Sequence, residues 1–103
     1  MKIETSHSWE ETISNVISNS TEIRISTLTL EEGEKTQPHS HKRPERIILP
    51  KSKVRILSEG LWIKVNTLEG EFTTVTIEPK DKHGLIAETP VTYFEVRTKA
   101  RSR

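Results

Sequence analysis

The spacing of apolar residues divides the chain into a short helical segment followed by a series of strands. Near the N-terminus, apolar residues recur at the 3.6-residue period that predicts one buried helix face. These residues are Trp9, Ile13, Val16 and Ile17. Ser8 lies three residues before Glu11, which is typical of a capping box at the start of a helix. The polar run 18–21 predicts its end.

After this helix, apolar and polar residues alternate, as expected for strands with one buried face. Ile23 and Ile25 share one parity. Leu28 and Leu30 have the opposite parity. Because a strand's side chains alternate between its two faces, this change predicts either a β-bulge near residues 26–27 or burial of both faces.

Turn residues break the rest of the chain into short strands. The expected strands are 46–49, 53–57, 61–67, 72–78, 83–88 and 91–97. The segment Ser58-Glu59-Gly60 predicts a hairpin between two of them. A series of short strands with frequent turns is typical of a small barrel or jelly roll, so we predict an all-β fold with a short N-terminal helix.

The length of 103 residues fits a single domain. We expect an N-terminal helical segment at 1–20, a barrel at 21–97 and a basic tail at 98–103. Only 31% of the residues are hydrophobic and 30% are charged. A small β shell explains both values, because its strands place polar residues at alternate positions.

Charge and cysteine content narrow the possible partners. The net charge of +1 gives no electrostatic case for nucleic acid, and we interpret the basic tail as a solvated segment rather than a nucleic-acid or membrane arm. No segment approaches the roughly 18 apolar residues of a membrane span, and the N-terminus lacks a signal-peptide core. The chain has no cysteine, which fits a reducing compartment. We therefore expect a cytoplasmic protein that binds neither nucleic acid nor membrane.

The segment 33–45 concentrates ligands that suit a divalent metal ion. His39, His41 and Glu45 lie within seven residues, and His83 follows later in the chain. On a strand, residues two apart point to the same face, roughly 6.6 Å apart. The imidazoles of His39 and His41 would then converge on one ion, whereas the alternative is a polar loop without a metal.

This segment resembles the first motif of the cupins, Gly-x5-His-x-His-x3-4-Glu, through Gly33, His39, His41 and Glu45. The segment 79–84, which contains His83, looks like a shortened form of the second cupin motif. The resemblance implies a small cupin-type β-barrel, also called a double-stranded β-helix or jelly roll. It also implies that one metal ion is held inside the barrel by His39, His41, Glu45 and His83.

Nitrogen and oxygen ligands without sulfur suit Fe, Mn, Ni, Co or Zn, and the sequence does not choose between them. The resemblance favours a metal-dependent enzyme acting on a small polar molecule, of dioxygenase, isomerase or lyase type. The alternatives are a non-catalytic cupin that binds or senses a small ligand, and a structural barrel that has kept its ligands. Tyr93 and Glu95 share a face of the last strand and form the one candidate acid–base pair, while Gln37 either contacts a substrate or faces solvent.

Other residues have structural interpretations. Arg43 and Arg46 would either hold an anionic substrate or be solvated, and we favour solvation. Trp62 and Tyr93 are expected in the core or at a dimer interface rather than in the cavity, and Trp9 is expected to fasten the helix to the barrel. Small cupins resemble one another in forming dimers, and an open barrel has edge strands to pair, so we predict a homodimer.

Overall fold

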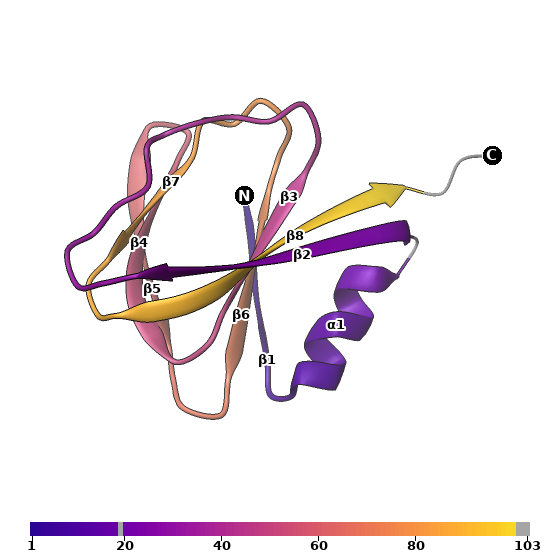
Figure 1. Cartoon of the computed structure of the whole chain (residues 1–103), viewed down its shortest axis with the longest axis horizontal. Helices are drawn as coiled ribbons and strands as arrows, with labels where there is room; N and C mark the ends of the chain where they lie inside the picture. Colours follow the sequence, from indigo (N-terminus) through magenta and orange to yellow (C-terminus); the bar gives the residue numbers. More distant parts are fainter. Residues whose placement is uncertain (19, 101–103) are drawn as a thin grey trace.

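Two antiparallel sheets, of five and three strands, enclose the interior of the molecule (Figure 1). The computed structural model describes residues 1–18 and 20–100. Its elements are β1 (Lys2–Ser6), α1 (Trp9–Ile17), β2 (Ser20–Leu30), β3 (Glu45–Leu49), β4 (Ser52–Ser58), β5 (Leu61–Thr67), β6 (Phe72–Ile77), β7 (Gly84–Ala87) and β8 (Val91–Ala100).

The strand order is β1-β6-β3-β8-β2 in the larger sheet and β5-β4-β7 in the smaller one. Apolar side chains from both sheets meet between them and form the main core. The fully buried members include Leu49, Val54, Ile56, Val75 and Ala87. This arrangement confirms the predicted all-β barrel.

A second, smaller core lies on the outer face of the larger sheet, where α1 covers it (Figure 1). Val16 of the helix packs there with Ile48 and Val96. The ring of Trp9 lies 5.0 Å from that of Phe94, centroid to centroid, so this residue fastens the helix as predicted. The predicted cap also forms, because the Ser8 hydroxyl accepts a hydrogen bond from the Glu11 amide at 3.0 Å.

The two cores explain the change of apolar parity in β2. The pairing of β2 with β8 is continuous from Glu22 to Leu30, so the bulge expected near residues 26–27 does not form there. Instead, Ile23 packs in the outer core, and Leu28 and Leu30 pack in the main core. Burial of both faces, the second alternative, is therefore the correct one.

The hairpin between β4 and β5 follows the prediction. Ser58 pairs with Leu61, which leaves Glu59 and Gly60 as a two-residue connection. Both have positive φ angles, 51° and 78°. Such a pair matches the type I′ turn, whose twist suits two antiparallel strands.

Three features differ from the sequence expectations. Within the N-terminal segment, residues 2–6 form β1, which pairs with β6. The last strand continues to Ala100 instead of ending at 97, and residues 101–103 of the expected tail lie outside the described residues. Trp62 is 45% exposed and so does not pack in the core.

Within the described part of the chain, no helix is long and apolar enough to cross a membrane.

Candidate metal centre

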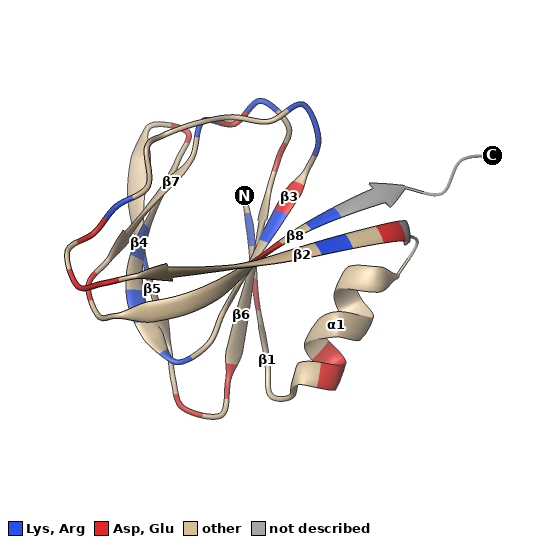
Figure 2. Ribbon diagram, viewed as in Figure 1, with Lys and Arg blue, Asp and Glu red and all other residues tan. Residues whose placement is uncertain are grey.

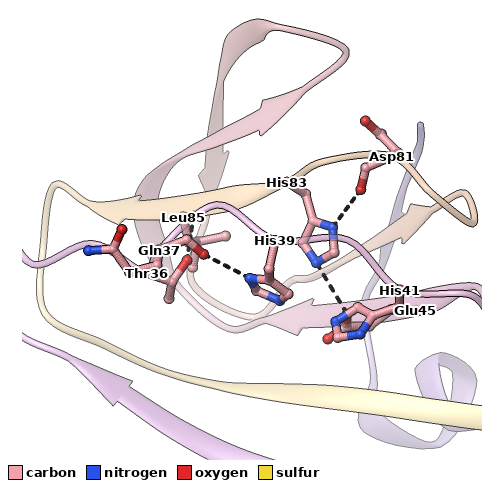
Figure 3. Close-up of polar contacts among 8 residues, drawn as sticks. All are labelled: Thr36, Gln37, His39, His41, Glu45, Asp81, His83 and Leu85. Atoms are coloured by element: carbon pink, nitrogen blue, oxygen red, sulfur yellow. Dashed lines mark hydrogen bonds and ion pairs between the residues drawn. The ribbon is translucent and has the colours of Figure 1, made fainter.

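The four predicted ligands come together at one end of the barrel interior (Figure 3). One potential ligand atom from each of His39, His41, Glu45 and His83 lies within 4.8 Å of the others. Residues far apart in the sequence thus converge on a single point. The cluster has the composition and spacing to hold a metal ion.

The segment that carries His39 and His41 is extended but forms no named strand. Backbone hydrogen bonds attach it to β7 and the residue before it. The Thr36 amide donates to the Leu85 carbonyl at 2.9 Å, and the His39 and His83 backbones exchange two hydrogen bonds of 3.0 and 2.8 Å. The segment therefore continues the smaller sheet irregularly, and it still directs both imidazoles to the same side (Figure 3).

Two histidine rings are oriented by backbone carbonyl groups. His39 Nδ1 lies 2.8 Å from the Gln37 carbonyl oxygen, and His83 Nδ1 lies 3.0 Å from that of Asp81. A carbonyl only accepts, so each Nδ1 carries the proton. Nε2 of each ring is then left with its lone pair, as in many histidines that bind metals. Gln37 thus acts through its backbone.

Glu45, at the start of β3, is only 1% exposed. Its Oε2 lies 2.8 Å from His41 Nε2 and 3.2 Å from His83 Nε2. Among the described residues, however, these nitrogens and both carboxylate oxygens have no hydrogen bond of proper geometry. Buried polar atoms are almost always satisfied. Unsatisfied imidazole nitrogens beside an unsatisfied carboxylate fit a bound cation in both charge and chemistry.

The pKa values of the cluster reflect burial and mutual interaction. Burial raises the pKa of Glu45, but the close approach of His83 and Glu95 and the charge of His41 outweigh it and lower that pKa to about 2. Burial lowers the pKa of His41, which Glu45 offsets only in part. For His83, burial opposes protonation, but the contacts with Glu45 and with the Asp81 carbonyl, together with the charges of both residues, outweigh burial and raise its pKa.

A cavity of about 460 Å³ adjoins the cluster, and we call it the inner cavity. It is lined by three histidines of the cluster, by Thr36, Gln37 and Gly84, and by Leu28, Ile47, Leu85, Tyr93, Glu95 and Arg97. Its volume lies within the range of small-molecule sites. The cluster is therefore next to a space that a small molecule can enter.

Glu95 and Tyr93 both line this inner cavity. Burial, the close approach of the Glu45 carboxylate and its charge together raise the pKa of Glu95 to about 7. Burial, with the charges of Glu95 and Glu45, raises the pKa of Tyr93 to about 12. At neutral pH, Glu95 can therefore hold or release a proton, whereas Tyr93 keeps its own.

Two residues near the site were not recognised from the sequence. Asp81 orients His83 through its backbone carbonyl, which carries no sequence signal. Arg97 lines the inner cavity and pairs directly with Glu45 across the sheet. Its parity on the last strand, the same as that of Tyr93 and Glu95, is the signal that would have identified it.

No protein-family model and no curated protein matches the sequence significantly. Solved structures do match. An RmlC-like cupin with a double-stranded β-helix fold from Methanocaldococcus jannaschii has a TM-score of 0.63 and 16% identity, over 76% of this chain and 71% of that one. A cupin protein from Bacteroides fragilis has a TM-score of 0.63 and 25% identity, over 81% of this chain and 70% of that one.

The polyketide cyclase RemF from Streptomyces resistomycificus also matches, with a TM-score of 0.61 and 14% identity over 78% of this chain and 57% of that one. The chain is therefore a small cupin by fold. The resemblance drawn from the motif at Gly33, His39, His41 and Glu45 is confirmed at that level.

Proposed function

We propose that this protein is a metal-dependent enzyme that acts on a small polar molecule in the inner cavity. One divalent transition metal ion, Fe, Mn, Ni, Co or Zn, would be held by His39, His41, Glu45 and His83. The observation that carries this proposal is that each of these four residues brings one potential ligand atom within 4.8 Å of the others. Among the described residues, the candidate ligand atoms of His41, Glu45 and His83 are also buried and unsatisfied. When bound, such an ion acts as a Lewis acid that polarises a carbonyl or stabilises an enolate.

Glu95 favours an enzyme over a passive ligand-binding module. Its carboxyl group lines the same cavity as the histidines, and in the metal-free protein its pKa is raised to about 7. Burial, the largest cause of this shift, is independent of Glu45 and favours a role in proton transfer. The Glu95 carboxylate would take a proton from a carbon next to a carbonyl. It would then return that proton to another carbon of the substrate, as in an isomerase, or pass it to a departing group as the bond to that group breaks, as in a lyase. This supports an isomerase or lyase reaction over oxygen-dependent chemistry. The structural similarity to a polyketide cyclase is compatible with catalysis on this fold but assigns no reaction.

Metal binding is tested by elemental analysis of the purified protein and of two matched variants. His39→Ala removes a ligand, whereas His7→Ala removes an exposed histidine outside the cluster. We expect about one equivalent of metal in the parent and in His7→Ala, and a clear loss in His39→Ala. Equal metal content in all three proteins would contradict the assignment.

Catalysis is tested by hydrogen–deuterium exchange in D₂O, followed by NMR, on a panel of oxo acids, hydroxy acids and sugar acids. The metal-loaded parent should exchange a C–H proton of at least one compound. Glu95→Gln should retain the metal and lose about a hundredfold or more of the exchange rate, as removal of a general base does. Metal uptake without exchange on any compound would instead support the non-catalytic binding or sensing cupin.

The homodimer stays a prediction. β5 is at the edge of the smaller sheet, and its Leu61 and Trp62 side chains are exposed. Pairing of such an edge with a second copy would satisfy its free backbone groups. Light scattering that gives the 11.8 kDa mass of a single chain would remove this prediction.

A further inference from the structure

A second cavity, of about 420 Å³, adjoins the cluster, and we call it the basic recess. Its lining residues are Glu22, Arg24, His41, Lys42, Arg43, Pro44, Glu45 and Arg97. His41 and Arg97 also line the inner cavity, so the two spaces meet at the metal cluster. Basic segments of β2, β8 and the loop leading into β3 lie at this end of the larger sheet (Figure 2).

The balance of charge in the recess is strongly positive. Four cations line it, against two carboxylates. One carboxylate, Glu22, contacts Arg24 at 3.4 Å. The other, Glu45, is a predicted metal ligand. Among the described residues, Lys42, Arg43 and Arg97 make no ion pair with a carboxylate.

The backbone register brings two of these cations together. Arg24 is the direct cross-strand partner of Arg97. Side chains directly opposite each other lie on the same face with Cβ atoms roughly 4.5–5.5 Å apart, and like charges there are destabilising. The charge of Arg97 also acts on both His41 and Glu95. Glu45, opposite Arg97 on β3, would offset this repulsion only until it binds a metal ion, and an anion in the recess would then take over that role.

We infer that the ligand of this protein is a small organic anion, whose carboxylate or phosphate group occupies the basic recess beside the metal cluster. The recess volume suits a small molecule, and an arginine guanidinium matches both groups through paired N–H donors. This inference rests on the proposed function, because it specifies the substrate class of the same site. Arg97 is the residue that joins anion recognition to the cluster, and Arg43 supports it from the loop.

The test is a calorimetric titration with succinate, with neutral succinamide as the matched control ligand, on metal-loaded and metal-free protein. Succinate should bind and succinamide should not. Arg97→Gln and Arg43→Gln should each weaken succinate binding by about tenfold or more while the metal content is retained. Arg55→Gln, on β4 and outside both cavities, is the matched control and should bind as the parent does.

Inorganic phosphate, titrated in parallel, separates the two sources of the anion. Tighter binding of phosphate assigns a phosphate group, and tighter binding of succinate assigns a carboxylate. The inference is overturned if neither anion binds at millimolar concentration, if succinamide binds equally well, or if Arg97→Gln and Arg43→Gln both bind succinate like the parent. A protein that takes up no metal but binds succinate through Arg97 would refute the proposed function and leave the recess assignment standing.

Discussion

The two ends of the barrel interior are built on the same strands but have opposite chemistry. The near end is the one that holds the histidine and glutamate cluster, and its inward-facing residues are ionisable. At the opposite, far end the inward-facing residues are apolar. Three strands show this change from the far end to the near end. On β3 the order is Leu49, Ile47 and Glu45, and along β7 and the residue before it the order is Ala87, Leu85 and His83. On β8 the order is Val91, Tyr93 and Glu95. One alternating pattern thus supplies packing at one end and ionisable groups, including potential metal ligands, at the other. The far end stabilises the fold, so the near end can keep polar atoms unsatisfied.

The largest expected effect on stability comes from a substitution at the far end. Leu49→Ala removes a fully buried side chain and should lower the free energy of unfolding by about 2–5 kcal/mol. The metal content per folded molecule should stay at that of the parent. Urea unfolding measures the change, with Leu68→Ala, at a 66% exposed position, as a control expected within about 0.5 kcal/mol. A lower metal content in fully folded Leu49→Ala protein would show that packing at the far end also supports the cluster.

At the near end, His41→Ala should weaken metal binding and leave the fold intact. It removes one ligand atom, so metal affinity should fall by about tenfold or more, since even the partners of metal ligands contribute this much. The circular dichroism spectrum should keep its β-sheet shape, because the far end still packs. Competition with a chelator gives the affinity. Unchanged metal affinity in this variant would refute the role of His41.

The pH dependence of stability should change sign when metal binds. In the metal-free protein, Glu95 and His83 have raised pKa values, so the folded state binds more protons than the unfolded one. The stability that Glu95 and His83 contribute is fully present at low pH and is lost as the pH rises through their raised pKa values, which for Glu95 is about 7. His41, whose pKa is lowered, acts in the opposite direction. We expect the melting temperature of the metal-free protein to fall over this range.

In the metal-loaded protein, the melting temperature should rise over the same range. The ion must displace the proton of His83, and fewer protons compete as pH increases. Thermal melts at a series of pH values, with and without metal, make this comparison. Parallel curves for the two forms would contradict the proposed ligand role of His83.

The smallest expected effect is on the repulsion between Arg24 and Arg97. In the metal-loaded protein without an organic ligand, Arg97→Gln should raise stability by about 0.2–1 kcal/mol at low salt, because it removes the like-charge pair with Arg24 while Glu45, opposite Arg97 on β3, is engaged by the ion. Added salt should reduce the difference by screening. Arg55→Gln is the contrast, since it removes an ion pair of 2.7 Å with Glu88 and should not stabilise. A loss of stability in Arg97→Gln would show that Arg97 has a structural partner.

Much of the fold followed from patterns that depend on local chemistry. The helix from Trp9, its Ser8 cap and the hairpin at Gly60 were predictable because each is specified by neighbouring residues. The strand β1 was not, since its only buried residue is Ser6 and its partner β6 lies far along the chain. The parity change in β2 was ambiguous because it depends on which element covers each face.

The candidate site shows the same limit. His39, His41, Glu45 and His83 could be grouped from residue type and spacing, and the structure brings them together. The basic recess could not be predicted, because it depends on the register that sets Arg97 opposite Arg24 and Glu45. Solvation of Arg43 was favoured from the sequence, and only the fold places this residue at a cavity wall. Pairwise register between distant strands is the information that the sequence pattern lacks.

Asp81 links the tip of the β4–β5 hairpin to the buried cluster. Its carboxylate accepts hydrogen bonds from the Ser58 hydroxyl at 2.5 Å and the Glu59 amide at 3.0 Å, and its carbonyl contacts the ring of His83 at 3.0 Å. Leu61, just beyond the turn, is 67% exposed. An environment-sensitive fluorophore attached there would test whether binding at the cluster is transmitted through Asp81 to the outside of the barrel. The same residue that orients a buried imidazole thus also holds a turn at the surface.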